Sequence, residues 1–125
     1  MMKKNINSKG APAAIGPYSQ GIKSDSLIFI SGQLPVDQKT GKMPEDIESQ
    51  TEQSIKNIIE ILKEEGLDLN NVIKTTVFLN DLSNFTKVNE VYSKYFSEPY
   101  PARSCIEVAK LPKGAGIEIE VIATE

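Results

Sequence analysis

The sequence contains no histidine and only one cysteine among its 125 residues. Without histidine there is no imidazole base, which excludes Ser-His-Asp and Cys-His mechanisms of nucleophilic catalysis. A zinc site is also excluded, because protein-bound zinc takes its ligands from several cysteine and histidine side chains. One cysteine cannot form a disulfide within the chain, which agrees with a reducing compartment. No Asp-rich loop with the spacing of a calcium site is present, although composition leaves a carboxylate-only Mg²⁺ site open.

Long apolar runs are missing too. No segment approaches the ~20 apolar residues of a membrane span, and no apolar run of signal-peptide length follows the basic N-terminus. The chain has 14 basic and 17 acidic residues and a formal net charge of -3, which gives no overall attraction to nucleic acid or anionic membranes. We therefore expect a soluble, cytoplasmic protein. Its length and its 39% hydrophobic content are typical of one globular domain over residues 1–125.

Two segments, residues 47–65 and 83–96, have the hydrophobic spacing of amphipathic helices. Asp46 precedes the first pattern as a capping residue, and Gly66 follows it as a natural C-terminal cap. The apolar stripe of this helix consists of Ile55, Ile58, Ile59 and Leu62. The apolar side of the second helix consists of Phe85, Val88, Tyr92, Tyr95 and Phe96.

Apolar and β-branched runs predict strands within residues 22–31, 72–79, 103–108 and 117–123. Residues 1–17 are rich in glycine, proline, alanine and asparagine, and we expect an arm that ends in a Gly-Pro turn. Two helices on one face of a sheet of about four to six strands make an economical two-layer α+β fold. They cannot cover both faces of that sheet. The second face should therefore meet another subunit, and we expect an oligomer.

Arg103 is the only arginine in a chain that otherwise uses lysine for positive charge. Its planar guanidinium binds a carboxylate through two hydrogen bonds, which lysine cannot do. A surface or ion-pair role for this arginine is an equally good interpretation. Cys105 lies two residues further, hence on the same strand face, and a small packing residue is the better interpretation because no base is available to activate it.

Glu118 and Glu120 alternate with apolar residues, so both carboxylates point to one sheet face. If the apolar residues meet the helices, the glutamates point away from them, where Arg103 could also point. An acid beside a guanidinium in a cleft could orient or deprotonate water. Ordinary solvated glutamates remain the simpler interpretation of either residue alone.

Four further residues are weaker candidates. Tyr18 follows the Gly-Pro turn and could line a pocket, although loop aromatics more often just pack. Ser31 and Gly32 end a predicted strand, where a backbone N–H could meet a substrate oxygen. Asn89 stands among apolar helix residues, where an inward amide would need hydrogen-bond partners. From the residues alone we predict a soluble α+β oligomer that could have a carboxylate-binding site.

Several segments in order resemble one family. The segments APAAIGPYSQG at residues 11–21 and ISGQLP at 30–35 are similar to the N-terminal half of the Rid (YjgF, L-PSP) family. The remaining matches are KTTVFL at 74–79, VNEVY at 88–92, PARSC at 101–105 and IEIE at 117–120. The resemblance covers about residues 10 to 123, nearly the whole chain, and is closest to the reactive intermediate deaminase branch.

This resemblance implies a chorismate-mutase-like α+β fold and a homotrimer whose sheets form a central barrel, with active sites in clefts between subunits. It implies hydrolysis of 2-aminoacrylate, 2-aminocrotonate and their imine tautomers to 2-oxo acids and ammonia, without a cofactor. Such substrates are released by pyridoxal-phosphate-dependent serine and threonine dehydratases. By the same resemblance Arg103 would bind the substrate carboxylate and Glu118 would orient or activate the attacking water, Glu120 being the weaker carboxylate candidate. The pocket would be lined by Tyr18, Ser31, Gly32, Asn89 and Cys105, the last through its backbone.

The chain departs from the family at residues 97–101, a loop that is shorter than in some members and should edge the pocket. Two other functions stay open. Some relatives are described as ribonucleases or translation inhibitors, but the acidic balance, the lack of histidine and the single arginine argue against that role here. A non-catalytic binder of small oxo acids would use Arg103 equally well, but Glu118 would then be dispensable.

Overall fold

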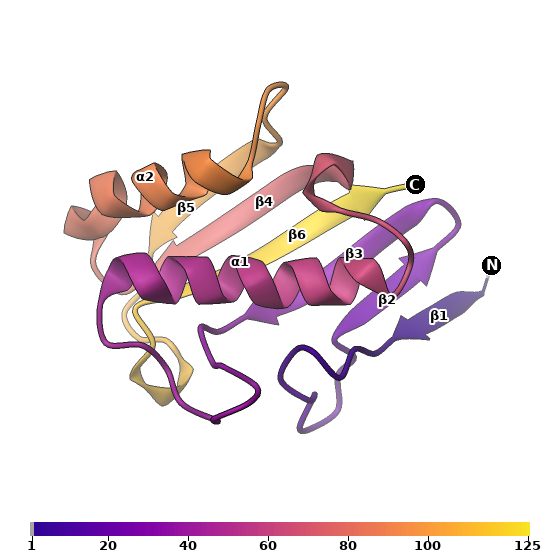
Figure 1. Cartoon of the computed structure of the whole chain (residues 1–125), viewed down its shortest axis with the longest axis horizontal. Helices are drawn as coiled ribbons and strands as arrows, with labels where there is room; N and C mark the ends of the chain where they lie inside the picture. Colours follow the sequence, from indigo (N-terminus) through magenta and orange to yellow (C-terminus); the bar gives the residue numbers. More distant parts are fainter. Residues whose placement is uncertain (1) are drawn as a thin grey trace.

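The structure is a computed structural model that describes residues 2–125. In chain order the elements are β1 (Lys3–Ile6), β2 (Gly21–Ser24), β3 (Leu27–Gln33), α1 (Ile47–Lys63), β4 (Val72–Leu79), α2 (Phe85–Tyr95), β5 (Ala102–Glu107) and β6 (Ile117–Thr124). The strands form one sheet in the order β1-β2-β3-β6-β4-β5. Both helices cover the same face of this sheet (Figure 1), which confirms the predicted two-layer α+β arrangement.

The connections explain why both helices lie on one face. β3 and β4 each run antiparallel to β6, so they are parallel to each other, and β4 is directly parallel to β5. The chain therefore makes two parallel crossovers, from β3 through α1 to β4 and from β4 through α2 to β5. Crossovers of this kind are almost always right-handed, and two that step in the same direction put their helices on the same side.

The first helix begins at the predicted residue and ends at Lys63, two residues earlier than predicted. The side chain of Asp46 accepts a hydrogen bond of 2.9 Å from the backbone N–H of Ser49, which satisfies one of the free donors of the first turn. At the other end, Gly66 adopts a left-handed conformation with φ of 69°. The N–H groups of Gly66 and Leu67 donate to the carbonyls of Lys63 and Leu62 over 3.0 and 3.1 Å, as in a Schellman motif.

The second helix is shorter than predicted. A 3-10 turn at Leu82–Asn84 precedes it, and α2 proper begins at Phe85. Val88 and Tyr92 are buried as expected, but Phe85 is 36% exposed. Its ring faces Arg103 on the neighbouring edge strand rather than the core.

For the N-terminal region one expectation is wrong, and a second is confirmed by β3 but missed a further strand. The arm contains a strand, β1, which pairs antiparallel with β2. The run within residues 22–31 is also two strands, because Asp25 takes a left-handed φ of 54° and turns the chain between β2 and β3. Asp25 and Ser26 are common turn residues, but they lie between two apolar segments, so the sequence pattern did not indicate a turn here.

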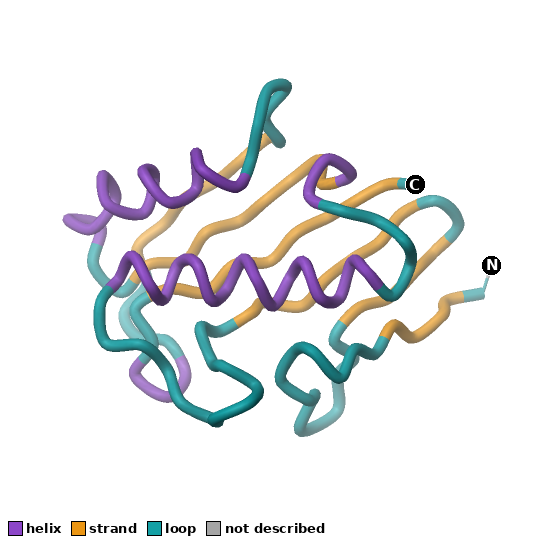
Figure 2. Tube along the Cα trace, viewed as in Figure 1, coloured by secondary structure: helices purple, strands orange, loops and turns teal. Residues whose placement is uncertain are grey.

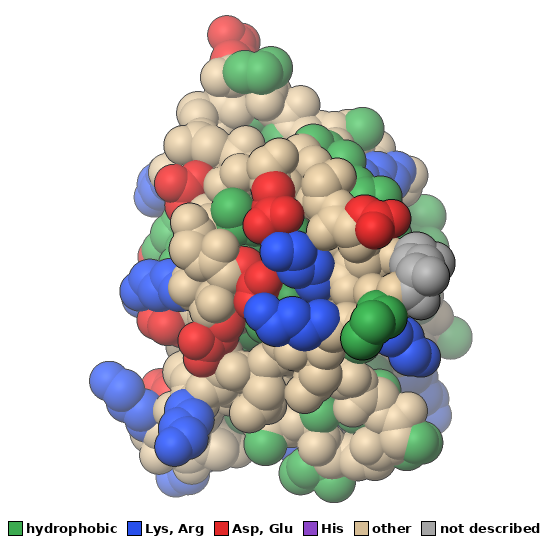
Figure 3. All heavy atoms as spheres, turned by 90° about the vertical axis from the view of Figure 1, so that its right-hand side faces the viewer, with side chains coloured by type: hydrophobic (Ala, Val, Ile, Leu, Met, Phe, Trp, Pro, Cys, Tyr) green, Lys and Arg blue, Asp and Glu red, His purple; other side chains and the backbone are tan. Residues whose placement is uncertain are grey.

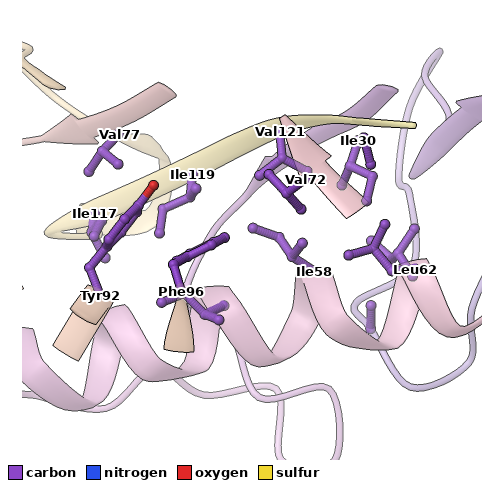
Figure 4. Close-up of a cluster of buried hydrophobic side chains, with 14 of the residues drawn as sticks. Ile30, Ile58, Leu62, Val72, Val77, Tyr92, Phe96, Ile117, Ile119 and Val121 are labelled. Carbon is purple, nitrogen blue, oxygen red and sulfur yellow. The ribbon is translucent and has the colours of Figure 1, made fainter. Parts of the chain in front are cut away.

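The core fills the space between the helices and the covered face. Figure 4 shows Ile58 of α1 below Val72 and Val121, and Leu62 of α1 beside Ile30, and all of them belong to one buried cluster. Burial of these apolar side chains is the main favourable contribution to folding. The inward positions of β6 alternate with outward ones, so Glu118 and Glu120 point to the uncovered face, as predicted.

The uncovered face is apolar in part. Phe29 is 42% exposed and pairs across strands with Ile122, while Ile106 is 46% exposed opposite Phe78. The face that carries both termini is different, because acidic and basic side chains mingle there (Figure 3). None of the helices within residues 2–125 is both long and apolar enough to cross a lipid bilayer.

Candidate functional site

The first candidate region surrounds Arg103 at the start of the edge strand β5. The Arg103 Nη1 group donates a hydrogen bond of 2.7 Å to the Asn89 Oδ1 atom of α2. The guanidinium opens onto a cavity of about 450 Å³. The cavity is lined by Asn89, Tyr92, Ser93, Tyr100, Pro101 and Arg103, and we call these residues the arginine half-site. Tyr100 and Pro101 come from the short loop that the family resemblance placed at the pocket edge.

Arg103 lies on the helix side of the sheet. It pairs in register with Thr75 of β4, which is fully buried and hydrogen-bonded to the Tyr92 hydroxyl of α2. Residues paired in this way point to the same face. Arg103 therefore does not share a face with Glu118 and Glu120, contrary to the interpretation that the sequence left open.

The second candidate region surrounds Glu118 on β6. A cavity of about 660 Å³ opens here, walled by the arm, by the loop after β3 and by the loop before β6. Figure 2 shows these three loops along the lower edge of the sheet. Among its lining residues we group Tyr18, Gln20, Ser31, Gly32, Lys113 and Glu118 as the glutamate half-site.

Gly32 lets Glu118 approach the backbone closely. It stands in an irregular stretch of β3, where three steps from Ile30 to Gln33 match two steps on β6. A Cβ atom at position 32 would collide with Oε2 of Glu118 and lie 2.7 Å from its Cδ. Only glycine leaves room for the carboxyl group in this position.

The surroundings of Glu118 favour its protonated form. Desolvation by burial raises the pKa of this half-buried carboxyl, and the negative charge of Glu120 raises the pKa further. A raised pKa brings proton exchange closer to neutral pH, which suits a group that must take and return a proton. Glu120 itself is exposed and lies opposite Thr76 on the uncovered face.

Ser31 and the arm are joined by hydrogen bonds. The Ser31 Oγ group donates to the Ser19 carbonyl over 2.6 Å, and the Ser31 N–H donates to the Gln20 carbonyl over 2.9 Å. The Gln20 side chain is 2% exposed and accepts from the N–H of Ser8 over 2.6 Å, while its amide donates to the carbonyl of Pro12 over 2.7 Å. These hydrogen bonds fix the loop that carries Tyr18.

The sequence interpretation missed Gln20 and Lys113. A glutamine next to a glycine carries no distinctive pattern, so the sequence did not indicate that Gln20 is buried and hydrogen-bonded to the backbone of the arm. Lys113 adopts a left-handed φ of 59°, which is uncommon for a residue with a side chain. The neighbouring Pro112 and Gly114 indicated a loop there, but not that it walls a cavity.

Cys105 behaves as the sequence predicted for a packing residue. It is half-buried, pairs in register with Val77, and packs against the core from the helix side. Burial raises the pKa of the Cys105 thiol, and the Arg103 charge opposes this only in part. The thiol therefore stays protonated near neutral pH and is a poor nucleophile.

The two half-sites do not meet within one chain. Arg103 pairs with Thr75 of β4 and Glu118 with Phe78 of the same strand, so they are two strands and three residues apart. Strand spacing and rise put their backbones about 14 Å apart, and their side chains leave opposite faces of the sheet. A single reaction that uses both groups would need a second copy of the chain.

The groups present support acid–base and anion-binding chemistry. Within residues 2–125, no three cysteine, aspartate or glutamate side chains come together as a metal site would require. Arg103 can bind an anion, and Glu118 can exchange a proton with water or substrate. Such a pair suits hydrolysis of a small carboxylate-bearing molecule.

Comparison with known proteins agrees with this chemistry. The chain is 50% identical to a 2-iminobutanoate/2-iminopropanoate deaminase of Salmonella typhimurium, with 98% of both chains covered. It is 54% identical to the chloroplastic Reactive Intermediate Deaminase A of Arabidopsis thaliana, over 98% of this chain and 66% of that protein. Among solved structures, Escherichia coli TdcF with bound serine superposes with a TM-score of 0.93 and is 46% identical, with 98% of both chains covered.

The YjgF gene product of Escherichia coli has the same fold, with a TM-score of 0.94 and 47% identity over 98% of both chains. These similarities extend over the strands and helices that carry both half-sites, and they agree with the resemblance seen in the sequence motifs. Residues 8–125 match the family model described as Endoribonuclease L-PSP, and the chain belongs to this family.

Proposed function

We propose that the protein hydrolyses 2-imino and 2-enamino acids to 2-oxo acids and ammonia. The observation on which the proposal rests is the pair of half-sites, one with a charged arginine and one with a half-buried carboxyl of raised pKa. Relatives about half identical to this chain are named as deaminases of 2-iminobutanoate and 2-iminopropanoate. The substrates would come from serine and threonine dehydratases in the cytoplasm, and the hydrolysis would need no cofactor.

Arg103 binds the substrate carboxylate in this proposal. One Nη1 donor is used by Asn89, and the guanidinium has further N–H donors for a bidentate contact. This contact fixes the carbon that bears nitrogen relative to the attacking water. The backbone of Cys105 and the side chain of Asn89 complete this side of the pocket.

Glu118 acts as the acid–base group on the side of the substrate away from Arg103. The carboxylate takes a proton from water while the water oxygen bonds to the imine carbon. It passes this proton to the imine nitrogen, which gives a carbon that bears one hydroxyl and one amino group. The carboxylate then moves the hydroxyl proton to the nitrogen as the carbon–nitrogen bond breaks, so the carbonyl of the 2-oxo acid forms and ammonia leaves. Imines hydrolyse readily, so positioning and one acid–base group suffice. Tyr18, Ser31 and Gly32 line this half.

The working unit is a homotrimer with the active sites between subunits. The apolar uncovered face and the separation of the two half-sites in one chain support an assembly of several copies. In a ring, the arginine half-site of one copy faces the glutamate half-site of the next. The number three follows from the family resemblance, with the sheets forming a central barrel.

The proposal is tested by coupling a threonine dehydratase to the purified protein and following the release of 2-oxobutanoate. Wild type should accelerate release over the uncatalysed rate, and Arg103→Ala and Glu118→Gln should each lose the acceleration. Acceleration by wild type and both variants alike would move the site elsewhere. A folded oligomer without acceleration would favour the oxo-acid binder, which should still bind 2-oxobutanoate as Glu118→Gln.

Mixing the two inactive variants tests the shared site. After unfolding and refolding together in equal amounts, about a quarter of the interfaces in a ring would join an intact Arg103 to an intact Glu118. Activity should recover to about that fraction of wild type. No recovery from properly mixed oligomers would place both groups in one chain and contradict the assembly. RNA cleavage that survives Arg103→Ala would separate any nuclease activity from this site.

A further inference from the structure

The side chain of Arg103 is held by aromatic rings. Its Cζ atom lies 4.9 Å from the ring centroid of Tyr92 and 5.4 Å from that of Phe85. Both distances are within the range of a cation–π interaction. Phe85, Asn89 and Tyr92 recur at i, i+4 and i+7 of α2, so one helix face supplies both rings and the amide that accepts from Arg103.

The two rings differ in how firmly they are anchored. Tyr92 is buried, stacks on Phe96 at 4.3 Å, and shares a hydrogen bond of 2.9 Å with the buried Thr75 hydroxyl. Figure 4 shows its ring directed from α2 toward the sheet. Phe85 is instead partly exposed at the start of α2, where a core role does not explain an aromatic ring.

The groups that contact Arg103 leave its positive charge available to a substrate carboxylate. Within residues 2–125, none of the ion pairs involves Arg103, and its single side-chain hydrogen bond there is to a neutral amide. A glutamate or aspartate at this place would hold the arginine equally well but would compete with a substrate carboxylate. Rings and an amide fix the guanidinium and leave its charge and remaining donors available.

We propose that Phe85 and Tyr92 form an aromatic bracket that fixes the orientation of the Arg103 guanidinium before substrate binds. Both are positioning residues, and the proposal rests on the carboxylate-binding role of Arg103 given above. The substrate carboxylate keeps its charge throughout hydrolysis, so the bracket stabilises bound substrate and transition state equally. Its loss should therefore raise KM and leave kcat nearly unchanged.

Kinetics and product binding test the bracket. Phe85→Leu keeps an apolar side chain at a partly exposed position, and it should raise KM and the Kd of 2-oxobutanoate about threefold to tenfold. Phe85→Tyr keeps a ring, so its KM and Kd should stay within about twofold of the wild-type values. In an Arg103→Ala background, where only residual binding can be measured, Phe85→Leu should not change the Kd of 2-oxobutanoate further. An equal loss in both backgrounds, or a fall in kcat alone, would overturn the proposal.

A matched pair of variants examines the second ring. Tyr92→Phe keeps the ring and removes the hydroxyl bond to Thr75, so KM should rise by no more than about threefold. Tyr95→Phe is the control, because this tyrosine lies on the same helix and donates over 2.8 Å to Glu52, away from Arg103. A larger KM for Tyr95→Phe than for Tyr92→Phe would contradict the bracket.

An NMR measurement separates the bracket from the proposed reaction. Arg103 is the only arginine of the chain, so its Nε–Hε signal is unique. The bracket predicts a restrained, ring-shifted signal in the free wild-type protein and a more mobile one in Phe85→Leu. Equal mobility in both would refute the bracket even if the enzyme is active. A restrained signal in a protein that neither binds nor hydrolyses would refute the reaction instead.

Discussion

The arginine half-site and the glutamate half-site treat their charged groups in opposite ways. Arg103 is exposed, yet two rings and an amide hold it in place. Glu118 is half-buried and lies against the backbone of Gly32, and Glu120 adds a second negative charge nearby. The first environment holds a charged group in place, and the second makes a charge easy to neutralise. This difference is what binding and proton transfer respectively require.

Among substitutions that leave Arg103 and Glu118 themselves unchanged, the largest effect is expected from Gly32→Ala, which disturbs only the glutamate half-site. The new Cβ would meet the Glu118 carboxyl and push it from its position. A displacement of about 1 Å can cost roughly 100-fold in rate, so kcat should fall by at least about that factor. Binding of 2-oxobutanoate through Arg103 should change far less, as measured by calorimetry.

Gly10→Ala is the matched control for this substitution. A Cβ at position 10 would lie 2.8 Å from Oε2 of Glu60, so it also displaces a glutamate carboxyl, but outside both half-sites. It should leave kcat near the wild-type value. If Gly32→Ala behaved like Gly10→Ala, the close approach of Glu118 to the β3 backbone would have no role in catalysis.

A smaller effect is expected from Asn89→Ala, which disturbs only the arginine half-site. It removes the 2.7 Å hydrogen bond from Arg103 and leaves both rings in place. Hydrogen bonds to charged groups contribute about 1.5–3 kcal/mol, and exposure to water reduces this, so KM should rise about tenfold with kcat nearly constant.

Asn84→Ala provides the control for Asn89→Ala, because Asn84 precedes the same helix and its side chain makes no capping bond. A fall in kcat without a change in KM for Asn89→Ala would assign the amide to the chemical step. That result would erase the proposed division between a binding half and a proton-transfer half.

The sequence predicted the elements that carry the two half-sites better than their relative placement. Alternation along β6 placed Glu118 and Glu120 opposite the helices correctly, because one face of that strand is fully buried. β5 has no such alternation and is exposed on almost every residue, so its sequence could not assign a face to Arg103. That face is decided by pairing with β4, a contact between residues far apart in the chain.

The role of Gly32 could likewise be predicted only in part from the sequence. A glycine inside a strand indicates a bulge or a close backbone approach, but from the sequence we expected Gly32 only to offer a backbone N–H donor. Which side chain approaches it depends on the register between β3 and β6, including the irregularity near Gly32. The sequence also placed Phe85 on the apolar side of the second helix, but its ring faces Arg103.

The smallest expected effect comes from Glu120→Gln, which changes only the electrostatics around Glu118. The Glu120 charge raises the pKa of Glu118, so a neutral glutamine should lower that pKa. Burial is the larger cause and remains, so the shift should be small. If Glu118 must be ionised to accept a proton from water, the acidic limb of the kcat/KM profile should move to lower pH.

Glu64→Gln removes the same charge from the exposed end of α1, and the profile of this control should match wild type. A shift of the alkaline limb instead would mean that Glu118 works as an acid, protonating the substrate before water attacks. An unchanged profile in Glu120→Gln would mean that another group sets the acidic limb. Glu118 would then position water without exchanging a proton, and neither half-site would transfer protons.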